Sequence, residues 1–339
     1  MAFSSKGLGL GLLAMASILQ QAAARAAHAE TSLKGVELPN RTIRVGSQLI
    51  SVQWSPDGAN LVSGSTDTMV RVWDAATGTC LQTLTGHKQK VSSVAYSPDG
   101  THVVSGSWDA TLKVWDAITG RCVQTLTGHD KAVASVAYSP DGSKIVSGSY
   151  DNTIKVWDAR SGECLRTLTD HSFIYCVAYS PDGAHIISGN SNKTVKMWDV
   201  ATGALLETFA GHAMAVSSVA YSPDGAHVMS GSWDGTIKVW DAASGTCLQT
   251  LTCGVLSSVN SVAYSPDGAN FISGSEDGII KVWDAGSGTC MQELNSHAGN
   301  VTSVAYSPYG AQILSGSNDE YSQGTIIIWY APVKLQSFV

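Results

Sequence analysis

The sequence predicts an all-β fold, a propeller of seven four-stranded antiparallel blades that close into a ring. The first observation is a repeat: the unit SGSWDATLKVWD at residues 105–116 returns in close copies at intervals of 41–46 residues. A period of roughly 20 to 50 residues is typical of arrays in which each unit buries its apolar face against the next. The second is that each copy codes several short strands. The copies are marked by Trp73, Trp115, Trp157, Trp198, Trp240, Trp283 and Trp329.

One repeat is enough to predict the strands of a blade. Residues 91–96 are β-branched and aromatic, and Ser97-Pro98-Asp99-Gly100 follows them. Proline presets φ and glycine supplies a positive φ, so this tetrapeptide predicts a hairpin turn. Residues 101–107, 111–115 and 122–127 are the next three strands. A lone four-stranded sheet exposes two faces and two edges, and a closed ring of such sheets buries the faces between neighbours.

Composition and charge exclude several classes of function. The formal net charge is −7 and the lysines and arginines form no run, so we expect no nucleic-acid partner. The sequence has no Gly-x-x-x-x-Gly-Lys phosphate loop, no His-Glu-x-x-His zinc pair and no nucleophile elbow. We therefore expect no enzyme, no cofactor and no metal site. The repeats form one domain over residues 31–339, and we expect a monomer.

Five cysteines stand seven residues after a repeat tryptophan, with Leu205 at this place in the fourth copy. Equivalent positions on different blades lie too far apart for a disulfide, whose Cα atoms must come within about 7 Å. We therefore interpret them as small buried residues. An odd total and the absence of Cys-x-x-Cys disfavour a disulfide framework or a metal cluster. The five are Cys80, Cys122, Cys164, Cys247 and Cys290.

Residues 1–30 differ from the repeats. Lys6 precedes an apolar run at residues 7–19, and Ala27-His28-Ala29 precedes Glu30. This layout predicts a secretory signal peptide and an extracytoplasmic or organelle-lumen location. The run is too short to span a bilayer, so we expect no stable membrane insertion of the mature chain. The alternative is a disordered leader on a cytoplasmic protein.

The motifs now support a family resemblance. Gly-His, Ser-Pro-Asp-Gly, Ser-Gly-Ser-x-Asp and Trp-Asp at this spacing resemble the WD40 repeat family over residues 45–330. The resemblance implies a β-propeller whose last blade joins the two chain ends. Strands at residues 301–306, 312–317 and 325–329 would then be completed by a strand near residues 36–45. The tail at residues 333–338 is a competing candidate.

Each of four copies contains a Ser/His/Asp set that could be mistaken for a hydrolase triad. Four equivalent sites between blades do not resemble one active site with an oxyanion hole. The resemblance instead implies structural tetrads of hydrogen-bonded histidine, serine, aspartate and tryptophan. They are His87, Ser105, Asp109 and Trp115; His129, Ser147, Asp151 and Trp157; His212, Ser230, Asp234 and Trp240; and His297, Ser315, Asp319 and Trp329.

Three copies depart from the tetrad. Asn192 replaces the aspartate in the copy with His171, Ser188 and Trp198, so we expect that blade to lose a buried charge. Val45 and Val255 take the histidine place in two others. The seventh copy gains residues 320–323, from Glu320 to Gln323, which we expect to form a projecting loop or to reflect drift near the closure.

Recognition should depend on positions that vary among the copies. The resemblance to the WD40 family implies that three positions of each copy lie on the upper face of the ring. One is the residue before the turn aspartate, and the other two are near the start of the first strand. These positions hold aromatic and charged side chains that suggest a peptide or protein segment as ligand. The partner-binding candidates are Lys90, Trp108, Tyr150, Phe173, Tyr175, Trp233 and Glu276. We predict a protein-interaction scaffold; the alternative is an extracytoplasmic propeller enzyme or carbohydrate-binding protein that uses the central channel.

Overall fold

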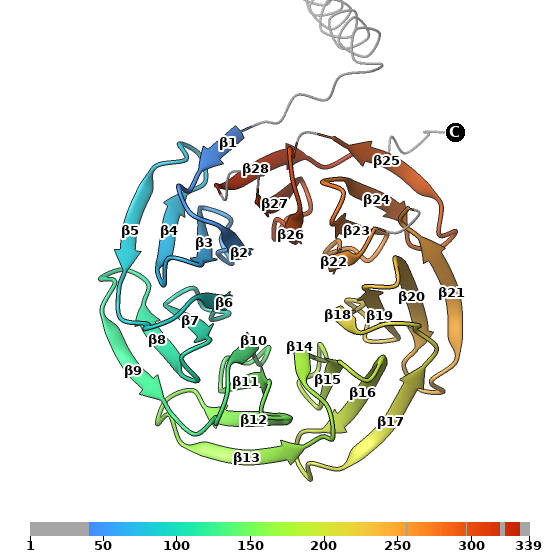
Figure 1. Cartoon of the computed structure of the whole chain (residues 1–339), viewed down its shortest axis with the longest axis horizontal. Helices are drawn as coiled ribbons and strands as arrows, with labels where there is room; N and C mark the ends of the chain where they lie inside the picture. Colours follow the sequence, from blue (N-terminus) through green and yellow to red (C-terminus); the bar gives the residue numbers. More distant parts are fainter. Residues whose placement is uncertain (1–40, 255–256, 296, 319–322, 333–339) are drawn as a thin grey trace, which may run out of the picture. The chain divides into compact units, whose positions relative to one another are not determined.

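The computed structural model describes residues 41–254, 257–295, 297–318 and 323–332. They form seven four-stranded antiparallel sheets arranged radially around a common axis (Figure 1). Blades 1 to 3 are β2 (Leu49–Trp54), β3 (Asn60–Ser65), β4 (Val70–Asp74) and β5 (Cys80–Leu84); β6 (Val91–Tyr96), β7 (His102–Ser107), β8 (Leu112–Asp116) and β9 (Cys122–Leu126); and β10 (Val133–Tyr138), β11 (Lys144–Ser149), β12 (Thr153–Asp158) and β13 (Cys164–Thr169).

Blades 4 to 7 repeat this order. They are β14 (Ile174–Tyr179), β15 (His185–Asn190), β16 (Thr194–Asp199) and β17 (Leu205–Ala210); β18 (Val216–Tyr221), β19 (His227–Ser232), β20 (Thr236–Asp241) and β21 (Cys247–Thr252); β22 (Val259–Tyr264), β23 (Asn270–Ser275), β24 (Ile280–Asp284) and β25 (Cys290–Leu294); and β26 (Val301–Tyr306), β27 (Gln312–Asn318) and β28 (Gly324–Tyr330) with β1 (Arg41–Arg44). The predicted seven-bladed all-β fold is confirmed.

An amino-terminal strand closes the ring, which is one of the two arrangements expected from the sequence; the other used the carboxyl-terminal tail. β1 pairs antiparallel with β28, with Arg41 opposite Ile328 and Arg44 opposite Thr325. Residues 333–338 lie outside the described residues, as do the leader at residues 1–30, Val255, Asp319 and most of the 320–323 insertion.

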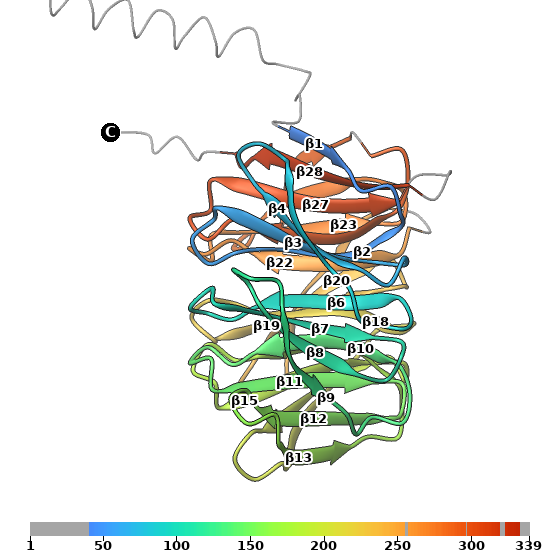
Figure 2. The same ribbon diagram turned by 90° about the vertical axis from the view of Figure 1, so that its left-hand side faces the viewer.

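The Ser-Pro-Asp-Gly turns fold as the sequence predicts. In blade 2, Gly100 has a φ of 72° and its amide donates to Ser97 O at 2.9 Å. The Ser97 hydroxyl donates to Asp99 Oδ1 at 2.6 Å, and that carboxylate also accepts from Thr101 N. Antiparallel strands then place successive turns at two opposite faces of the disc, which Figure 2 shows edge-on. We call the face with the connections between blades and the turn at Asp109 the upper face.

The hydrophobic core lies between blades rather than inside one. Val62, Val72 and Leu84 of blade 1 pack in one cluster with Val91 and Trp115 of blade 2, and the other clusters repeat this arrangement. The glycine of each Ser-Gly-Ser motif allows the close approach: a Cβ on Gly106 would lie 2.7 Å from Val133 Cγ1 of the next blade. Each blade therefore depends on its neighbour for burial, which is the physical reason for the repeat.

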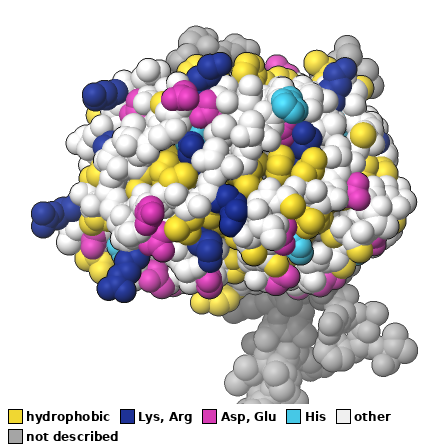
Figure 3. Space-filling model, turned by 90° about the horizontal axis from the view of Figure 1, so that it is seen from below, with side chains coloured by type: hydrophobic (Ala, Val, Ile, Leu, Met, Phe, Trp, Pro, Cys, Tyr) yellow, Lys and Arg dark blue, Asp and Glu magenta, His cyan; other side chains and the backbone are white. Residues whose placement is uncertain are grey.

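The cysteine prediction was half right. All seven described cysteines are free, but the five at the start of the outermost strands are exposed rather than buried. The side chain that follows each is exposed as well, for example Leu165 at 48%. Figure 3, a view from the side on which β13 lies, shows such hydrophobic side chains between charged ones on the outer wall. An outermost strand has no blade outside it, so an apolar residue there is not automatically buried.

Candidate functional site: the upper face

Each complete tetrad links the upper face to the interior of its blade. In blade 2, His87 Nδ1 lies 3.0 Å from Asp109 Oδ2 and Nε2 lies 2.8 Å from Ser105 Oγ, while Trp115 Nε1 donates to the same Oγ at 2.8 Å. A carboxylate only accepts, so Nδ1 carries the proton and Nε2 can accept from the serine. The structure brings the same four groups together around His129 in blade 3 and His212 in blade 5.

The histidine and aspartate side chains of each complete tetrad are buried, and in blade 2 burial affects the pKa of both. The His87 side chain is fully buried and that of Asp109 is 7% exposed, so Ser105 Oγ is shielded from any substrate. Burial alone would raise the pKa of Asp109, but hydrogen bonds from Thr111, Lys88 N and His87 lower it below its usual range. Burial lowers the pKa of His87 in spite of the nearby carboxylate. The neutral imidazole and the carboxylate are thus the stable pair.

Blade 7 holds its histidine differently from the expected tetrad. His297 Nε2 lies 2.7 Å from Ser315 Oγ, and Trp329 Nε1 donates to that oxygen at 2.8 Å. The other ring nitrogen, Nδ1, contacts the Ser317 hydroxyl. Burial lowers the pKa of His297 to about 4. Asp319, the predicted fourth member, lies outside the described residues.

Blades 1 and 6 keep only the serine and tryptophan, which remain hydrogen-bonded at 2.9 Å in each. Val45 is buried at the histidine place of blade 1, and Asp67 pairs with Arg71 at 2.6 Å instead. In blade 6 the buried Cys253 comes within 3.5 Å of Ser273 Oγ. Sequence reasoning assigned the place to Val255 and missed Cys253, which stands two residues earlier.

Blade 4 corrects a prediction. His171 does not join Ser188 and Trp198; it is exposed, and Asp170 is buried in its stead. Lys196 Nζ lies 2.9 Å from the Asp170 carboxylate, so the blade keeps a buried charge rather than losing it. The residue before the histidine differs between blade 4 and the blades with complete tetrads. Gly86, Gly128 and Gly211 have φ values of 155°, 147° and 154° there, which Asp170, not being glycine, does not adopt.

The five predicted aromatic residues form one contiguous cluster, which we call the aromatic face: Trp108, Tyr150, Phe173, Tyr175 and Trp233. Ring centroids lie 5.8 Å apart between Trp108 and Tyr150, 5.5 Å between Tyr150 and Tyr175, and 5.0 Å between Tyr175 and Trp233. Phe173 lies 5.6 Å from Tyr150. Trp108, Phe173 and Trp233 are 37–41% exposed. The cluster crosses blades 2 to 5.

Backbone bonds fix the aromatic face at the ends of strands. Trp108 N donates to Lys90 O, Tyr150 N to Ala132 O, and Trp233 N to Ala215 O, each at 3.0 Å. Lys90 Nζ stands 3.3 Å from the Trp108 ring centroid, a cation–π contact. Glu276 takes the corresponding position in blade 6, where it is exposed and makes no ring contact. The structure therefore unites six of the seven partner-binding candidates and leaves Glu276 outside the cluster.

The aromatic face coincides with a loss of bonds between blades. At the position of Tyr175, Ser92 and Ser217 bond to the carbonyl oxygen of the next inner strand, at Val133 and Val259. Tyr175 makes no such bond, and it contacts other aromatic rings instead.

A second kind of bond between inner strands is missing at the same place. Serine hydroxyls accept from the next blade's amide at six of the seven junctions, as Ser93 does from Val136 at 3.1 Å. Cys176 replaces this serine between blades 4 and 5, where its Sγ is 4.0 Å from Val216 O.

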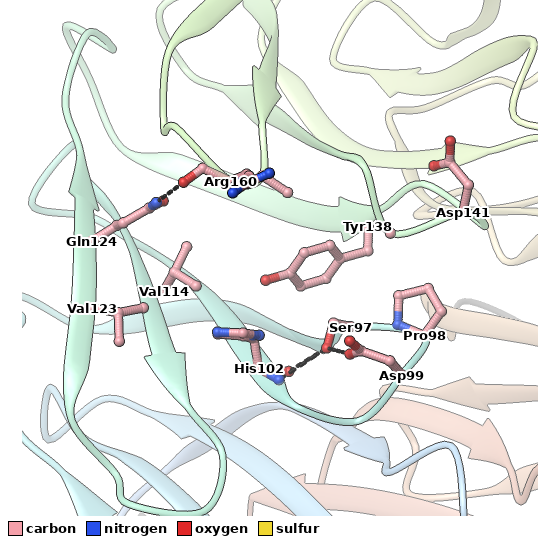
Figure 4. A pocket seen from close by; sticks show the side chains of 12 residues that line it. Ser97, Pro98, Asp99, His102, Val114, Val123, Gln124, Tyr138, Asp141 and Arg160 are labelled. Atoms are coloured by element: carbon pink, nitrogen blue, oxygen red, sulfur yellow. Dashed lines mark hydrogen bonds between the residues drawn. The ribbon is translucent and has the colours of Figure 1, made fainter.

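Grooves between blades form a separate feature. One of about 650 Å³ lies between blades 2 and 3, where the Tyr138 ring faces His102 and Gln124 Nε2 donates to Arg160 O at 2.6 Å (Figure 4). A groove of about 570 Å³ repeats it between blades 5 and 6 with His227, Gln249 and Tyr264 at the same places. Because the same residues recur, these grooves follow from the framework and do not distinguish one blade from another.

Within the described residues, no group of three or more His, Cys, Asp or Glu side chains could hold a metal ion. That part of the chain also has no helix of the length and apolarity needed to cross a bilayer.

Comparison with known proteins agrees with the architecture. Two curated proteins share one repeat length with the chain: polyadenylation factor subunit 2 of Gibberella zeae, 50% identical, and that of Neurospora crassa, 48% identical, each over 42 residues. The match covers 12% of this chain and only 7% and 6% of theirs, so it reflects the shared repeat. The family described as WD domain, G-beta repeat matches residues 40–74, 78–116, 120–158, 162–199, 203–241, 245–284 and 288–329. The chain belongs to this WD40 family.

Proposed function

We propose that this propeller is a protein-interaction scaffold and that the aromatic face binds a peptide or protein segment. The observation that carries the proposal is the contiguous row of partly exposed rings over blades 2 to 5, in which Tyr175 takes a place where Ser92 and Ser217 bond to the next blade. Aromatic side chains combine a large apolar area with few rotatable bonds, and binding hot spots favour them.

The tetrads support this proposal, because they stabilise the blades while the rings remain exposed for binding. They are buried beneath the upper face and hold its turns in place, so the rings above them are presented on a rigid frame. A rigid frame lowers the entropy lost on binding. Recognition therefore depends on the aromatic face and stability on the tetrads.

The experiment uses the full chain as bait in a protein extract of the organism from which the chain comes. We expect specific capture of a protein that is lost in the double variant Trp108→Ala/Trp233→Ala. The matched control is Tyr309→Ala/Tyr330→Ala, which removes two rings that are 79% and 68% exposed elsewhere on the molecule. Capture that survives loss of both tryptophans would contradict the proposal, and turnover or binding of glycans without protein capture would favour the channel-based alternative.

The compartment is tested separately. We propose, from residues 1–30 alone, that the chain is exported. Mass spectrometry of the mature amino terminus should find a start near Glu30, and a mature chain that keeps Met1 or Ala2 would contradict export.

A further inference from the structure

The exposed side chains of the upper face over blades 2 to 4 carry more positive than negative charge, in a chain whose net charge is −7, and the tetrad carboxylates of Asp109 and Asp151 there are only 7% exposed. Lys88, Lys90, Lys131 and Lys193, which we call the lysine group, lie in its turns and connections, and Asp130 is the exposed carboxylate among them. No described carboxylate lies within ion-pair distance of any of the four. The lysine group is therefore available to an anion.

Two of these lysines are held against the aromatic face. Lys90 Nζ is 3.3 Å from the Trp108 centroid, and Lys131 Nζ is 5.6 Å from that of Phe173. Burial lowers the pKa of Lys90, because its charged form has lost water without gaining a carboxylate. An incoming carboxylate would restore that lost stabilisation through a charge-assisted hydrogen bond.

The other end of the aromatic face is apolar. Trp233 is 39% exposed and Met214 49% exposed, and Ala213 and Ala215 flank Met214. Beyond blade 5, Glu276 occupies the next equivalent position and would repel an acidic chain. The face thus changes from cationic over blades 2 and 3 to apolar over blade 5.

We propose that the occupant of the aromatic face is an extended acidic peptide segment. Its carboxylates lie over the lysine group, and its apolar side chain rests on Tyr175 and Trp233. Successive ring centroids from Trp108 to Trp233 are 5.8, 5.5 and 5.0 Å apart, a path that about five residues span at roughly 3.3 Å each. This inference rests on the proposed function and adds the chemistry of the ligand.

The test uses three fluorescein-labelled octapeptides with the same phenylalanine and leucine positions and with Glu, Gln or Lys at all others. Fluorescence anisotropy with the full chain measures Kd at 50 and 500 mM NaCl. We expect the Glu peptide to bind most tightly, the Lys peptide least, and the high salt to weaken the Glu peptide severalfold. Lys90→Gln and Lys131→Gln should each weaken the Glu peptide by about two- to fivefold. Lys144→Gln, a matched change on the opposite face, should not.

The outcomes separate the two proposals. If the Gln or Lys peptide binds as tightly as the Glu peptide and Trp108→Ala weakens it, the acidic ligand is wrong and the aromatic face stands. If Trp108→Ala/Trp233→Ala leaves all three affinities unchanged, neither proposal survives for this ligand class. If no peptide binds, the acidic segment is rejected, and protein capture then decides on the face. Thermal unfolding of each lysine variant checks that the fold is intact.

Discussion

Replacing His212 by alanine tests whether the tetrads stabilise the blades. The change removes two hydrogen bonds, from Nδ1 to Asp234 at 3.0 Å and between Nε2 and Ser230 at 2.8 Å. Neither partner is left alone, because Asp234 keeps bonds from Ala213 N and Thr236 and Ser230 keeps that from Trp240. Each lost bond therefore costs about 0.5–1.5 kcal/mol rather than the full penalty of a stranded buried group.

The imidazole also fills space beside the Trp240 ring, whose centroid is 6.1 Å away. A small cavity should add about 1 kcal/mol. We expect a total loss of about 2–4 kcal/mol, and a fall in Tm of roughly 3–7 °C for a domain of this size. Urea unfolding followed by tryptophan fluorescence measures the free energy, and scanning calorimetry the Tm.

His171→Ala is the matched control, because His171 belongs to the same repeat position by sequence yet is exposed in the structure. We expect its effect to stay within about 0.5 kcal/mol. Binding at the aromatic face should persist in both variants. Equal stability of His212→Ala and the wild type, or an equal loss in both variants, would refute the reasoning.

Three further changes probe the packing and burial. Gly148→Ala should lower the free energy of unfolding in urea by about 1–3 kcal/mol, because its Cβ would lie 2.5 Å from Ile174 Cγ2. The control Gly286→Ala should cost little, because the nearest atom to its Cβ would be 3.5 Å away. Equal effects of the two changes would contradict the close approach of the blades at Gly148. Maleimide should label the five exposed cysteines of the native chain and spare Cys176 and Cys253. Burial raises the pKa of Cys176 to about 12 and that of Cys253 to about 11, so neither forms the reactive thiolate readily. Rapid labelling of all seven cysteines would contradict this. The pKa of His297 is lowered from 6.5 to about 4, so the unfolded chain takes up its proton first as the pH falls. Stability should therefore hold above about pH 6.5 and fall by about 3 kcal/mol towards pH 4. A parallel profile in His297→Gln would contradict this.

The fold could be predicted because several local signals agree in every copy. The turn at Gly100, the buried Val94 and the terminal Trp115 each point to the same antiparallel sheet, and the repeat multiplies the signal. The closing strand could not be assigned, since both chain ends carry apolar residues. Only the pairing of β1 with β28 decides between them.

Blade 4 shows where sequence reasoning by alignment fails. The motif Gly-His was matched through its histidine, although the residue before the histidine is an aspartate in blade 4. With Asp170 in place of glycine, the aspartate enters the blade and His171 leaves it. The usable signal was the Asp-His dipeptide together with Lys196, a lysine that donates to a threonine in other blades, as Lys113 does to Thr125.

The exposed cysteines illustrate a different limit. In the sequence, an apolar residue that faces solvent on the outermost strand looks the same as an apolar residue that faces a neighbouring blade. Along β9, Cys122 and Val123 are both exposed, Val123 at 49%, and only Leu126 at the other end is buried, at 3% exposure. The sequence pattern does not say which of the two sides another blade covers.

The junction of blades 4 and 5 connects stability to recognition. Cys176 removes one bond between the inner strands, Tyr175 removes another, and blade 4 has an ion pair where blade 5 has a tetrad. The junction tolerates these losses because it still buries an apolar cluster, in which Phe209 of blade 4 packs with Val216 and Trp240 of blade 5. In exchange, the rings of Tyr175 and Trp233 come to lie 5.0 Å apart across the junction. At this junction the inner strands make neither of the two bonds, so a ring can occupy the position of Tyr175, while the tetrads of blades 2, 3 and 5 hold the turns that carry the other rings. This is a physical reason for the aromatic face to lie here.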